Sequence, residues 1–434
     1  MDNKQQLLFL ELNELNFEFV EHYAGKGKLP HFDAFLSRHG YEETESEQRY
    51  EELEPWIQWV TAHTGLPYSE HGIFRLGDIV EADIPQIWEE LEEAGLLVGA
   101  VSPMNAKYRL EDPAFFIPDP WTETTTVAGE IDTRLYRAIR QAVSDNATGG
   151  LRKKFLLDLI VGAMRNAAPT NYVRYAQLVG SARNRPWSKA LVLDQLLADL
   201  FTRLVRAKKP HFASLFLNAG AHIQHHYMFN SAVYDGPHRN PTWYVRPDHD
   251  PVFDVYRLYD NILGQIMRAL PDARVMLATG LHQVPYGKTT FYWRLLDHAG
   301  FMSMLGVPHQ SVEPRMSRDF VLRCSSVAEA SEAERRLRLA QDEGGIALFI
   351  VDNRGSDLFV TLSYPDDIPE GMGCVIGNQR IDNFRRHVGF VAIKNGEHDG
   401  TGYFSDSGHD ARKSGARFPL REIPDRIRTA LGVA

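Results

Sequence analysis

The chain has 434 residues, with 47 Lys and Arg against 57 Asp and Glu, a net charge of −10, and 44% hydrophobic residues. This apolar fraction is ample for a packed core and excludes a disordered or fibrous chain. The negative charge argues against nucleic-acid binding, because phosphate contacts need clustered Lys and Arg. Two cysteines, Cys324 and Cys374, can form one bridge at most, so no disulfide framework supports the fold.

Neither a secretory leader nor a membrane span is predicted. The apolar run at residues 7–10 is interrupted at once by Glu11 and is too short for a signal segment. A later run, residues 156–164, contains Asp158 and falls short of the roughly 18 apolar residues that a spanning helix needs. We therefore expect a cytoplasmic protein with no membrane span.

Short leucine-rich or β-branched runs alternate with helical patterns along the chain, which is typical of βαβ units and a mostly parallel sheet. Strands are expected at residues 7–12, 97–101, 211–218, 274–279 and 388–394. Helices are expected at residues 17–22, 31–38 and 84–93. The predicted fold class is α/β, with a doubly wound, mostly parallel sheet.

Two insertions are expected within a single domain that covers residues 1–434. Residues 122–209 form a helical insertion, since apolar side chains recur there at helical spacing over a stretch too long for one crossover. Residues 310–386 form a smaller α+β insertion, with a helix at 327–341 and strands at 346–352 and 358–362 around Asn353-Arg354-Gly355.

Polar residues follow four of the expected strands, at the edge where open α/β sheets bind their ligands. These segments are residues 11–14, 218–226, 279–283 and 395–402. Within the second, His222 lies three and four residues before His225 and His226, so on a helix these side chains share a face and can hold one metal ion. The alternative is that the histidines only pack at the start of a helix.

Five segments follow one another along the chain in a recognisable order. They are the opening strand with Leu29-Pro30-His31-Phe32, Thr64-Gly65-Leu66-Pro67 with Glu70-His71-Gly72-Ile73, Ile223-Gln224-His225-His226-Tyr227, residues 396–404, and residues 418–433. This series resembles the motifs of the alkaline phosphatase superfamily, in its type I phosphodiesterase/nucleotide pyrophosphatase branch. The resemblance implies a sheet of alkaline phosphatase type.

The resemblance also implies two metal ions held by Asp and His and a Thr, Ser or Cys nucleophile, a combination suited to in-line displacement at phosphorus or sulfur. This chain departs from that pattern. Asn13 and Ala221 stand where the family has Asp, and neither Asp nor His is in register at residues 279–282. Pro55 stands at the nucleophile position, or Leu53 with a shift of two residues, and neither side chain can attack a substrate.

A rebuilt, histidine-rich site is the first interpretation. Its metal ligands would be His222, His225, His282 and His398, with Glu11 or Glu14. The catalytic residues would be Thr61 as nucleophile with His225 and His398, and substrate would be bound by Asn13, Glu54, Trp56 and Arg246. One divalent metal, Zn, Mn or Fe, is expected, although a metal-free site is equally compatible with these residues.

Two functions follow from these residues. The first is an atypical superfamily enzyme that acts on a phosphate- or sulfate-type ester or transferable group. The alternative is a non-catalytic pseudoenzyme that binds a glycan or nucleotide-like ligand or a partner protein. We expect a small anionic or glycan-like ligand and no nucleic acid, and assembly into a homo-oligomer stays open.

Overall fold

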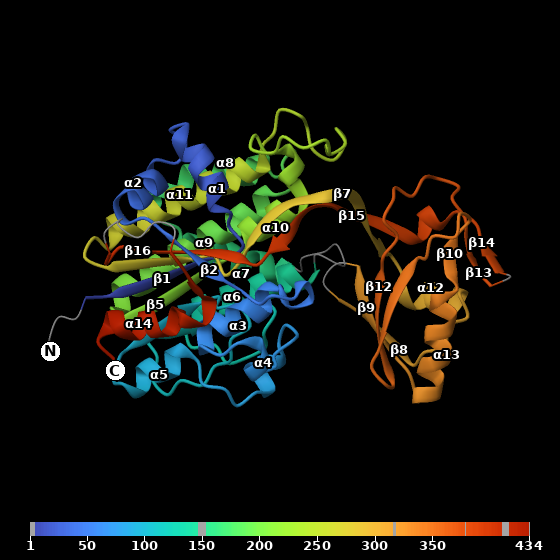
Figure 1. Cartoon of the computed structure of the whole chain (residues 1–434), viewed down its shortest axis with the longest axis horizontal. Helices are drawn as coiled ribbons and strands as arrows, with labels where there is room; N and C mark the ends of the chain where they lie inside the picture. Colours follow the sequence, from blue (N-terminus) through green and yellow to red (C-terminus); the bar gives the residue numbers. More distant parts are fainter. Residues whose placement is uncertain (1–4, 146–152, 316–317, 378, 410–415, 434) are drawn as a thin grey trace. The chain divides into compact units, whose positions relative to one another are not determined.

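The computed structural model describes residues 5–145, 153–315, 318–377, 379–409 and 416–433 (Figure 1). The chain divides into two compact units, Met1–Pro285 with Gly396–Ala434, and Tyr286–Asn395. It passes between them in strands β7 (His282–Leu295) and β15 (Val388–Asp399), which pair with each other as a two-stranded sheet. None of the described helices is both long and apolar enough to cross a bilayer.

The first unit is built on an eight-stranded sheet in the order β17-β2-β16-β6-β1-β5-β3-β4. Its strands are β1 Leu7–Leu12, β2 Glu42–Glu45, β3 Val98–Val101, β4 Phe115–Ile117, β5 Phe212–Leu217, β6 Arg274–Ala278, β16 Thr401–Asp406 and β17 Arg417–Pro419. The five strands from β4 to β6 run parallel, and β16 adds antiparallel to β6. The predicted α/β fold with a mostly parallel sheet is therefore confirmed.

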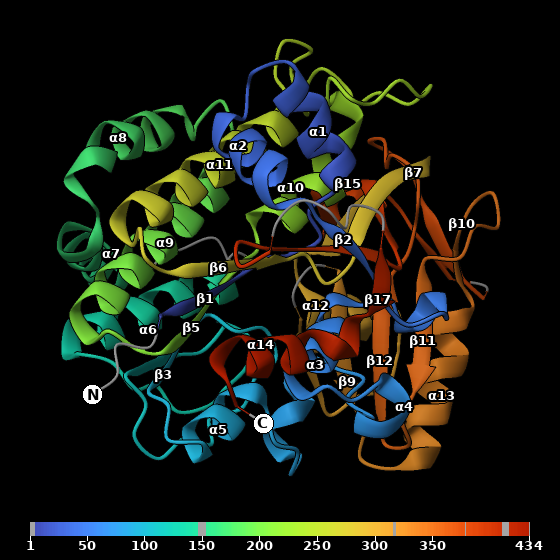
Figure 2. The same cartoon turned by 60° about the vertical axis from the view of Figure 1, so that its left-hand side comes forward.

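Both faces of this sheet are buried, as the continuous apolar sequence of its central strand requires. Side chains alternate along β1, so that Leu8 and Leu10 enter one apolar core while Leu7 and Phe9 enter another on the opposite face. Figure 2 shows helices on both sides of the strands, which is the doubly wound arrangement.

Helices of the first unit cover the two faces separately. The first core contains side chains from α1 (Phe17–Gly25), α2 (Pro30–His39), α9 (Ser188–Lys208), α10 (Ala219–Tyr227) and α11 (Pro251–Ala269). The second contains side chains from α3 (Pro55–Thr64), α5 (Ile87–Glu93) and α14 (Ile423–Leu431). The short α4 (Tyr68–His71) follows α3. Residues 122–209, expected as a helical insertion, contain α6 (Glu130–Asp145), α7 (Lys153–Asn166), α8 (Tyr172–Ser181) and α9.

The second unit has its own apolar core and antiparallel sheets. A four-stranded sheet has the order β11-β12-β9-β8, and a three-stranded sheet has the order β10-β13-β14. The bounds are β8 Ser311–Pro314, β9 Asp319–Arg323, β10 Ala340–Asp342, β11 Phe349–Asn353, β12 Asp357–Leu362, β13 Cys374–Ile376, β14 Gln379–Ile381, α12 His298–Met304 and α13 Val327–Arg338. The expected segment 310–386 lies inside this unit.

One expected strand of the main sheet lies elsewhere. Residues 388–394 belong to β15, which pairs with β7, and β16 takes the place beside β6. The apolar run VGFVAIK predicts a strand correctly, but its composition does not identify the strand with which it pairs.

Candidate metal centre

Three side chains of the first unit converge on one point. The Nε2 atoms of His225 and His398 are 3.2 Å apart, and each lies 3.2 Å from Oε2 of Glu14. Within the described part of the chain, these residues make the one group of three or more His, Cys, Asp or Glu side chains spaced to hold a metal ion. The cluster is therefore the candidate functional site.

The fold explains this convergence. Strands β1 and β5 are parallel neighbours, so the residues that follow them lie at the same edge of the sheet. Glu14 lies two residues beyond β1, and His225 lies in α10, which follows β5. His398 comes from β15 as the chain returns to the first unit.

The backbone of Glu14 is held in the left-handed region, with a φ of 61°. This conformation is uncommon for a residue with a side chain and persists only where the surroundings impose it. Here the Glu14 amide donates to the carbonyl of Thr279, 3.0 Å away, and Gln224 Nε2 donates to the Glu14 carbonyl at 2.8 Å. The turn thus directs the Glu14 carboxylate away from the strand and toward α10.

Amide groups fix the buried Glu14 carboxylate. Gln283 Nε2 donates to Oε2 and also to the carbonyl of Ala221, and Asn13 Nδ2 lies 3.2 Å from Oε1. Burial alone raises the pKa of a carboxyl, but the imidazoles of His398 and His225 oppose this, and the pKa of Glu14 lies far below its usual range. Glu14 is therefore an anion in the folded protein.

Helix α3 holds the turn from the other face of the sheet. Trp59 Nε1 donates to Asn13 Oδ1 at 2.7 Å, and His63 Nε2 lies 2.9 Å from Oε2 of Glu11. Trp59 and His63 are one helical turn apart, while Glu11 and Asn13 are two residues apart on an extended chain. Trp59 and His63 therefore lie on one face of α3, and Glu11 and Asn13 point to one face of the sheet, so that each helix residue meets one residue of the extended chain.

The structure brings some of the expected substrate-binding residues to the cluster. Asn13 supports Glu14, as described above. Glu54, at the start of α3, has its Oε2 3.9 Å from Nδ1 of His398. Trp56 donates from Nε1 to the carbonyl of Phe74, and Arg246 pairs with Asp248 at 3.0 Å on an exposed segment. No described contact links Trp56 or Arg246 to the three-residue cluster.

Thr61, the expected nucleophile, is buried in α3, with its Oγ1 3.2 Å from Nε2 of His71. Burial lowers the pKa of His71 to about 4, so its ring is neutral near pH 7. Because Nδ1 of His71 accepts a hydrogen bond from the Ile73 amide, the ring proton resides on Nε2 and is donated to Thr61. His71 is consequently not arranged to take a proton from Thr61.

Two expected metal ligands lie outside the three-residue cluster. His222 is exposed one turn before His226 on α10, with ring centres 5.0 Å apart. His282 is buried, and its Nδ1 lies 2.6 Å from the carbonyl oxygen of Thr401. That contact gives His282 a hydrogen-bond partner in the backbone.

Gln283 and Gln224 support the cluster, and neither is among the site residues that the sequence predicts. Both amides are buried, and Tyr256 donates to Oε1 of Gln224 at 2.8 Å. A partial signal exists, because Gln283 directly follows His282 in one of the polar segments at strand ends. Its partner was not predictable from spacing, since Gln283 and Glu14 are far apart in sequence.

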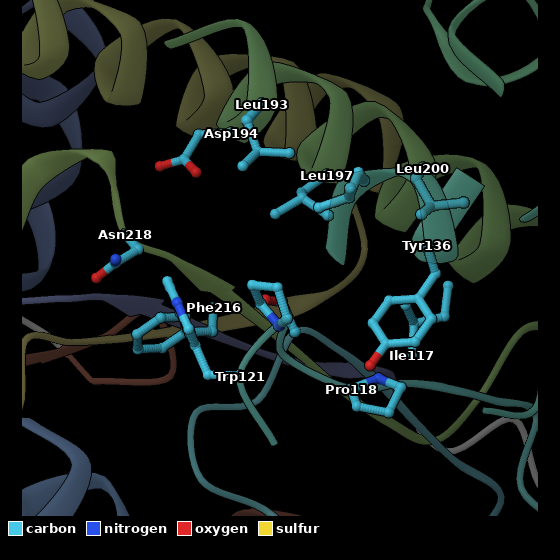
Figure 3. Close-up of a pocket in the computed structure, with 13 residues that line it drawn as sticks. Ile117, Pro118, Trp121, Tyr136, Leu193, Asp194, Leu197, Leu200, Phe216 and Asn218 are labelled. Atoms are coloured by element: carbon cyan, nitrogen blue, oxygen red, sulfur yellow. The ribbon is translucent and has the colours of Figure 1, made fainter. Parts of the chain in front are cut away.

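A small cavity lies at the same edge of the sheet, with a volume of about 30 Å³. Figure 3 shows Leu193, Asp194 and Leu197 on one side of it and Phe216 and Trp121 on the other. Burial raises the pKa of Asp194 to about 6. This volume suffices for one or two water molecules, so the cavity is a packing void and does not accommodate a substrate.

The donor set of the cluster fits a single transition-metal ion. Two imidazoles and one carboxylate are the protein ligands of several catalytic zinc sites and of non-haem Fe(II) sites. A tetrahedral zinc ion with bonds of about 2.0–2.1 Å separates its ligand atoms by roughly 3.3 Å. The 3.2 Å spacings of Glu14, His225 and His398 agree with that geometry.

No protein-family model and no curated protein matches the chain. Among solved structures, it is similar to phosphonoacetate hydrolase from Sinorhizobium meliloti 1021, at 13% sequence identity and a TM-score of 0.47, over 99% of this chain and 96% of that chain. It is also similar to murine and human ectonucleotide pyrophosphatase/phosphodiesterase 5, at 11% and 10% identity and TM-scores of 0.43, with the same coverage. The ordered sequence motifs, and not these overall likenesses, carry the resemblance to the alkaline phosphatase superfamily.

Proposed function

We propose that this chain is a metal-dependent hydrolase of the alkaline phosphatase superfamily, with a site reduced from two metal ions to one. The observation that carries the proposal is the triangle of Glu14, His225 and His398, with 3.2 Å between its ligand atoms. His225 and His398 lie at the two positions where the sequence motifs match the family. Glu14 supplies the anionic ligand that Asn13 and Ala221 do not.

Each residue has a chemical task in this proposal. The ion would act as a Lewis acid that polarises an ester oxygen and makes bound water more acidic. Glu14 holds negative charge in a buried position, fixed by Gln283 and Asn13. Glu54 Oε2 lies 3.9 Å from Nδ1 of His398, which is longer than a hydrogen bond; its negative charge favours a proton on Nδ1 and thus leaves Nε2 free as a ligand.

The proposed substrate is a phosphate- or sulfate-type ester. Its anionic group would be drawn to the ion, and the family resemblance supports this ester chemistry. The attacking group is water or the Thr61 hydroxyl. Water is favoured because His71 donates a hydrogen bond to Thr61 Oγ1 and is therefore not placed to remove its proton. Activity retained in Thr61→Val would support water, and activity abolished in a folded variant would support Thr61.

Steady-state hydrolysis tests the proposal. The zinc- or iron-loaded protein would be assayed with p-nitrophenyl phosphate, bis-p-nitrophenyl phosphate, p-nitrophenyl sulfate and an aryl phosphonate ester. We expect at least one substrate to be turned over, with kcat/KM falling by about 10³-fold or more in His225→Ala. His222→Ala is the matched control, since it removes an exposed imidazole from the same helix and should leave the rate within about twofold. Equal losses in both variants, or no turnover of any substrate, would contradict the proposal.

A second candidate function is a metal-binding protein without catalysis. The observation that favours it is the loss of the family's acidic ligands at Asn13 and Ala221 together with its nucleophile at Pro55. It predicts a bound metal that depends on His225 and His398 but no turnover of any ester. Metal content and turnover, measured on the same preparation, separate the two candidates.

A further inference from the structure

An apolar face of the helical block has no covering partner in the described chain. Seven of the eighteen exposed large apolar side chains among the described residues fall within residues 156–179. They are Leu156, Leu157, Ile160, Met164, Tyr172, Val173 and Val179, each 47% to 69% exposed. Single exposed apolar residues are ordinary, but such a concentration marks an interaction surface. We call it the α7–α8 face.

The face arises because both helices are apolar on two sides. The inner side of α7 places Leu159 and Ala163 against the main core, and the inner side of α8 does the same with Tyr175 and Leu178. On α7, the exposed residues at positions 156, 157, 160 and 164 fall within one third of the helix circumference, which makes a continuous stripe. Figure 2 shows α7 and α8 along the outer side of the helical block.

The stretch of chain that contains α7 and α8 is positively charged, whereas the whole chain is negatively charged. Residues 153–189 contain seven Lys or Arg and one acidic residue, Asp158, in a protein whose net charge is −10. Asp158 is buried and paired with Arg134 at 2.5 Å, so it does not offset the positive charge at the surface. Arg165, Arg183 and Lys189 are exposed. Arg165 lies 4.0 Å from Asp132, whereas Arg183 and Lys189 have no acidic partner within 4.0 Å among the described residues. These two basic side chains accompany the apolar face.

We infer that the α7–α8 face binds the surface of an anionic phospholipid bilayer. An aliphatic surface flanked by Lys and Arg is the pattern by which interfacial helices insert their apolar side between lipid headgroups, while the basic side chains meet anionic lipids. The cores of protein–protein interfaces are enriched in aromatic residues, whereas this face has Tyr172 as its single aromatic residue. The inference does not depend on the proposed catalytic function.

Vesicle flotation with the full chain tests this inference. Vesicles of phosphatidylcholine with about 30% phosphatidylserine should carry the protein to the top of the gradient. Pure phosphatidylcholine vesicles should bind it at least about tenfold more weakly, as should the mixed vesicles when salt is raised from about 0.1 to 0.5 M. Absent binding, or binding indifferent to phosphatidylserine, would overturn the inference.

Two sets of variants locate the surface. Leu157→Ser/Met164→Ser/Val173→Ser should reduce the partition coefficient at least about tenfold, and Arg183→Gln/Lys189→Gln should reduce it about threefold or more. The matched control, Leu296→Ser/Leu339→Ser/Ile350→Ser, removes equally exposed apolar side chains from the second unit and should bind like the native chain. Unchanged binding in the α7–α8 variant would overturn the inference. So would sedimentation equilibrium showing a dimer that this variant dissociates, since the face would then join two copies of the chain.

Discussion

In the proposed metal site, Glu14 would determine which ions can be bound. Two histidines alone make a weak and unselective ligand pair, and a buried carboxylate beside them adds the negative charge that a divalent ion requires. The carboxylate reaches the histidines because the turn after β1 adopts a positive φ at Glu14. The cost of that conformation is met by the Thr279 and Gln224 hydrogen bonds to the Glu14 backbone.

Gln283 provides a first prediction at the residue scale. Gln283→Ala removes the donor to Glu14 Oε2 and leaves the carboxylate less well oriented, so the affinity for zinc should fall about 10–100-fold. Competition with a chromophoric chelator measures this change. Gln86→Ala is the matched control, because Gln86 is equally buried but bonds Glu89 and Lys107 in another region. An unchanged affinity in Gln283→Ala would contradict the supporting role.

His71 provides a second prediction, on stability against pH. Burial lowers its pKa from 6.5 to about 4, so the unfolded chain binds a proton in this range that the folded chain does not. The contribution of neutral His71 to the free energy of unfolding is fully present above pH 6.5. As the pH falls toward 4, about 2–3 kcal/mol of this contribution is lost. Urea unfolding at pH 7 and pH 4.5 should show a larger loss for the native chain than for His71→Asn. Parallel losses in the two proteins would show that His71 does not titrate in this way.

The sequence allowed some of these residues to be predicted and not others. His225 and His398 were identified because they occupy two matched motif positions. From the sequence, Glu11 and Glu14 are alternatives for the acidic ligand. In the structure, strand alternation directs Glu11 to the face of Leu7 and Phe9, where it meets His63. Nothing local in the sequence predicts a positive φ at Glu14, since that conformation is imposed by distant hydrogen bonds.

At the scale of elements, α3 and β16 pack against the turns at the strand ends and thereby hold the residues of the candidate site in position. The Trp59 and His63 contacts tie α3 to β1, and the αL turn at Gly280, with a φ of 73°, lies against the Trp59 ring. β16 packs equally tightly, since a Cβ added at Gly402 would lie within 3.0 Å of the Gly280 carbonyl oxygen. A larger residue here would displace the turn.

Gly402→Ala tests this packing. The added methyl group meets Thr44 Oγ1 and the Gly280 carbonyl, and relief requires movement of β16, β2 or the turn. We expect a loss of about 1–3 kcal/mol in the free energy of unfolding, measured with urea. Gly25→Ala is the control, because no atom lies within 4 Å of its added Cβ and the change should be neutral or slightly stabilising. A neutral Gly402→Ala would contradict the tight packing of β16.

Element boundaries and pairings were predictable to different degrees. The hairpin expected at 346–352 and 358–362 is present as β11 and β12, with Asn353 opposite Leu358, because a short polar turn determines its register. The pairing of residues 388–394 was not predictable, since a buried strand carries no local signal of its partner. The pairing of β7 with β15 follows from the division of the chain into two units, because the chain enters the second unit through β7 and leaves it through β15.

At the scale of the whole molecule, the chain is a sheet unit that contains the site and a second unit with a separate core. The sequence indicated an insertion from its change of pattern near residue 310, while contacts place the unit at Tyr286–Asn395. Its boundaries fall inside β7 and β15. Pro285, Gly287, Asn395 and Gly396 lie there, but they belong to continuous strands and do not form a linker.

The second unit should fold by itself. An excised Tyr286–Asn395 fragment retains the complete second core and both of its sheets, so it should unfold cooperatively with urea, as domains of about 100 residues do. Circular dichroism measures the transition. The fragment should bind no zinc, because Glu14, His225 and His398 are outside it. A fragment without cooperative unfolding would show that its core depends on the remainder of the chain.

The central claim is that Glu14, His225 and His398 hold one metal ion. Elemental analysis of protein purified from metal-replete cells tests it most directly. We expect about one equivalent of zinc or iron in the native chain and in His222→Ala, and less than about a tenth of an equivalent in the His225→Ala/His398→Ala double variant. Less than a tenth of an equivalent in the native chain, or a full equivalent retained by the double variant, would contradict the claim.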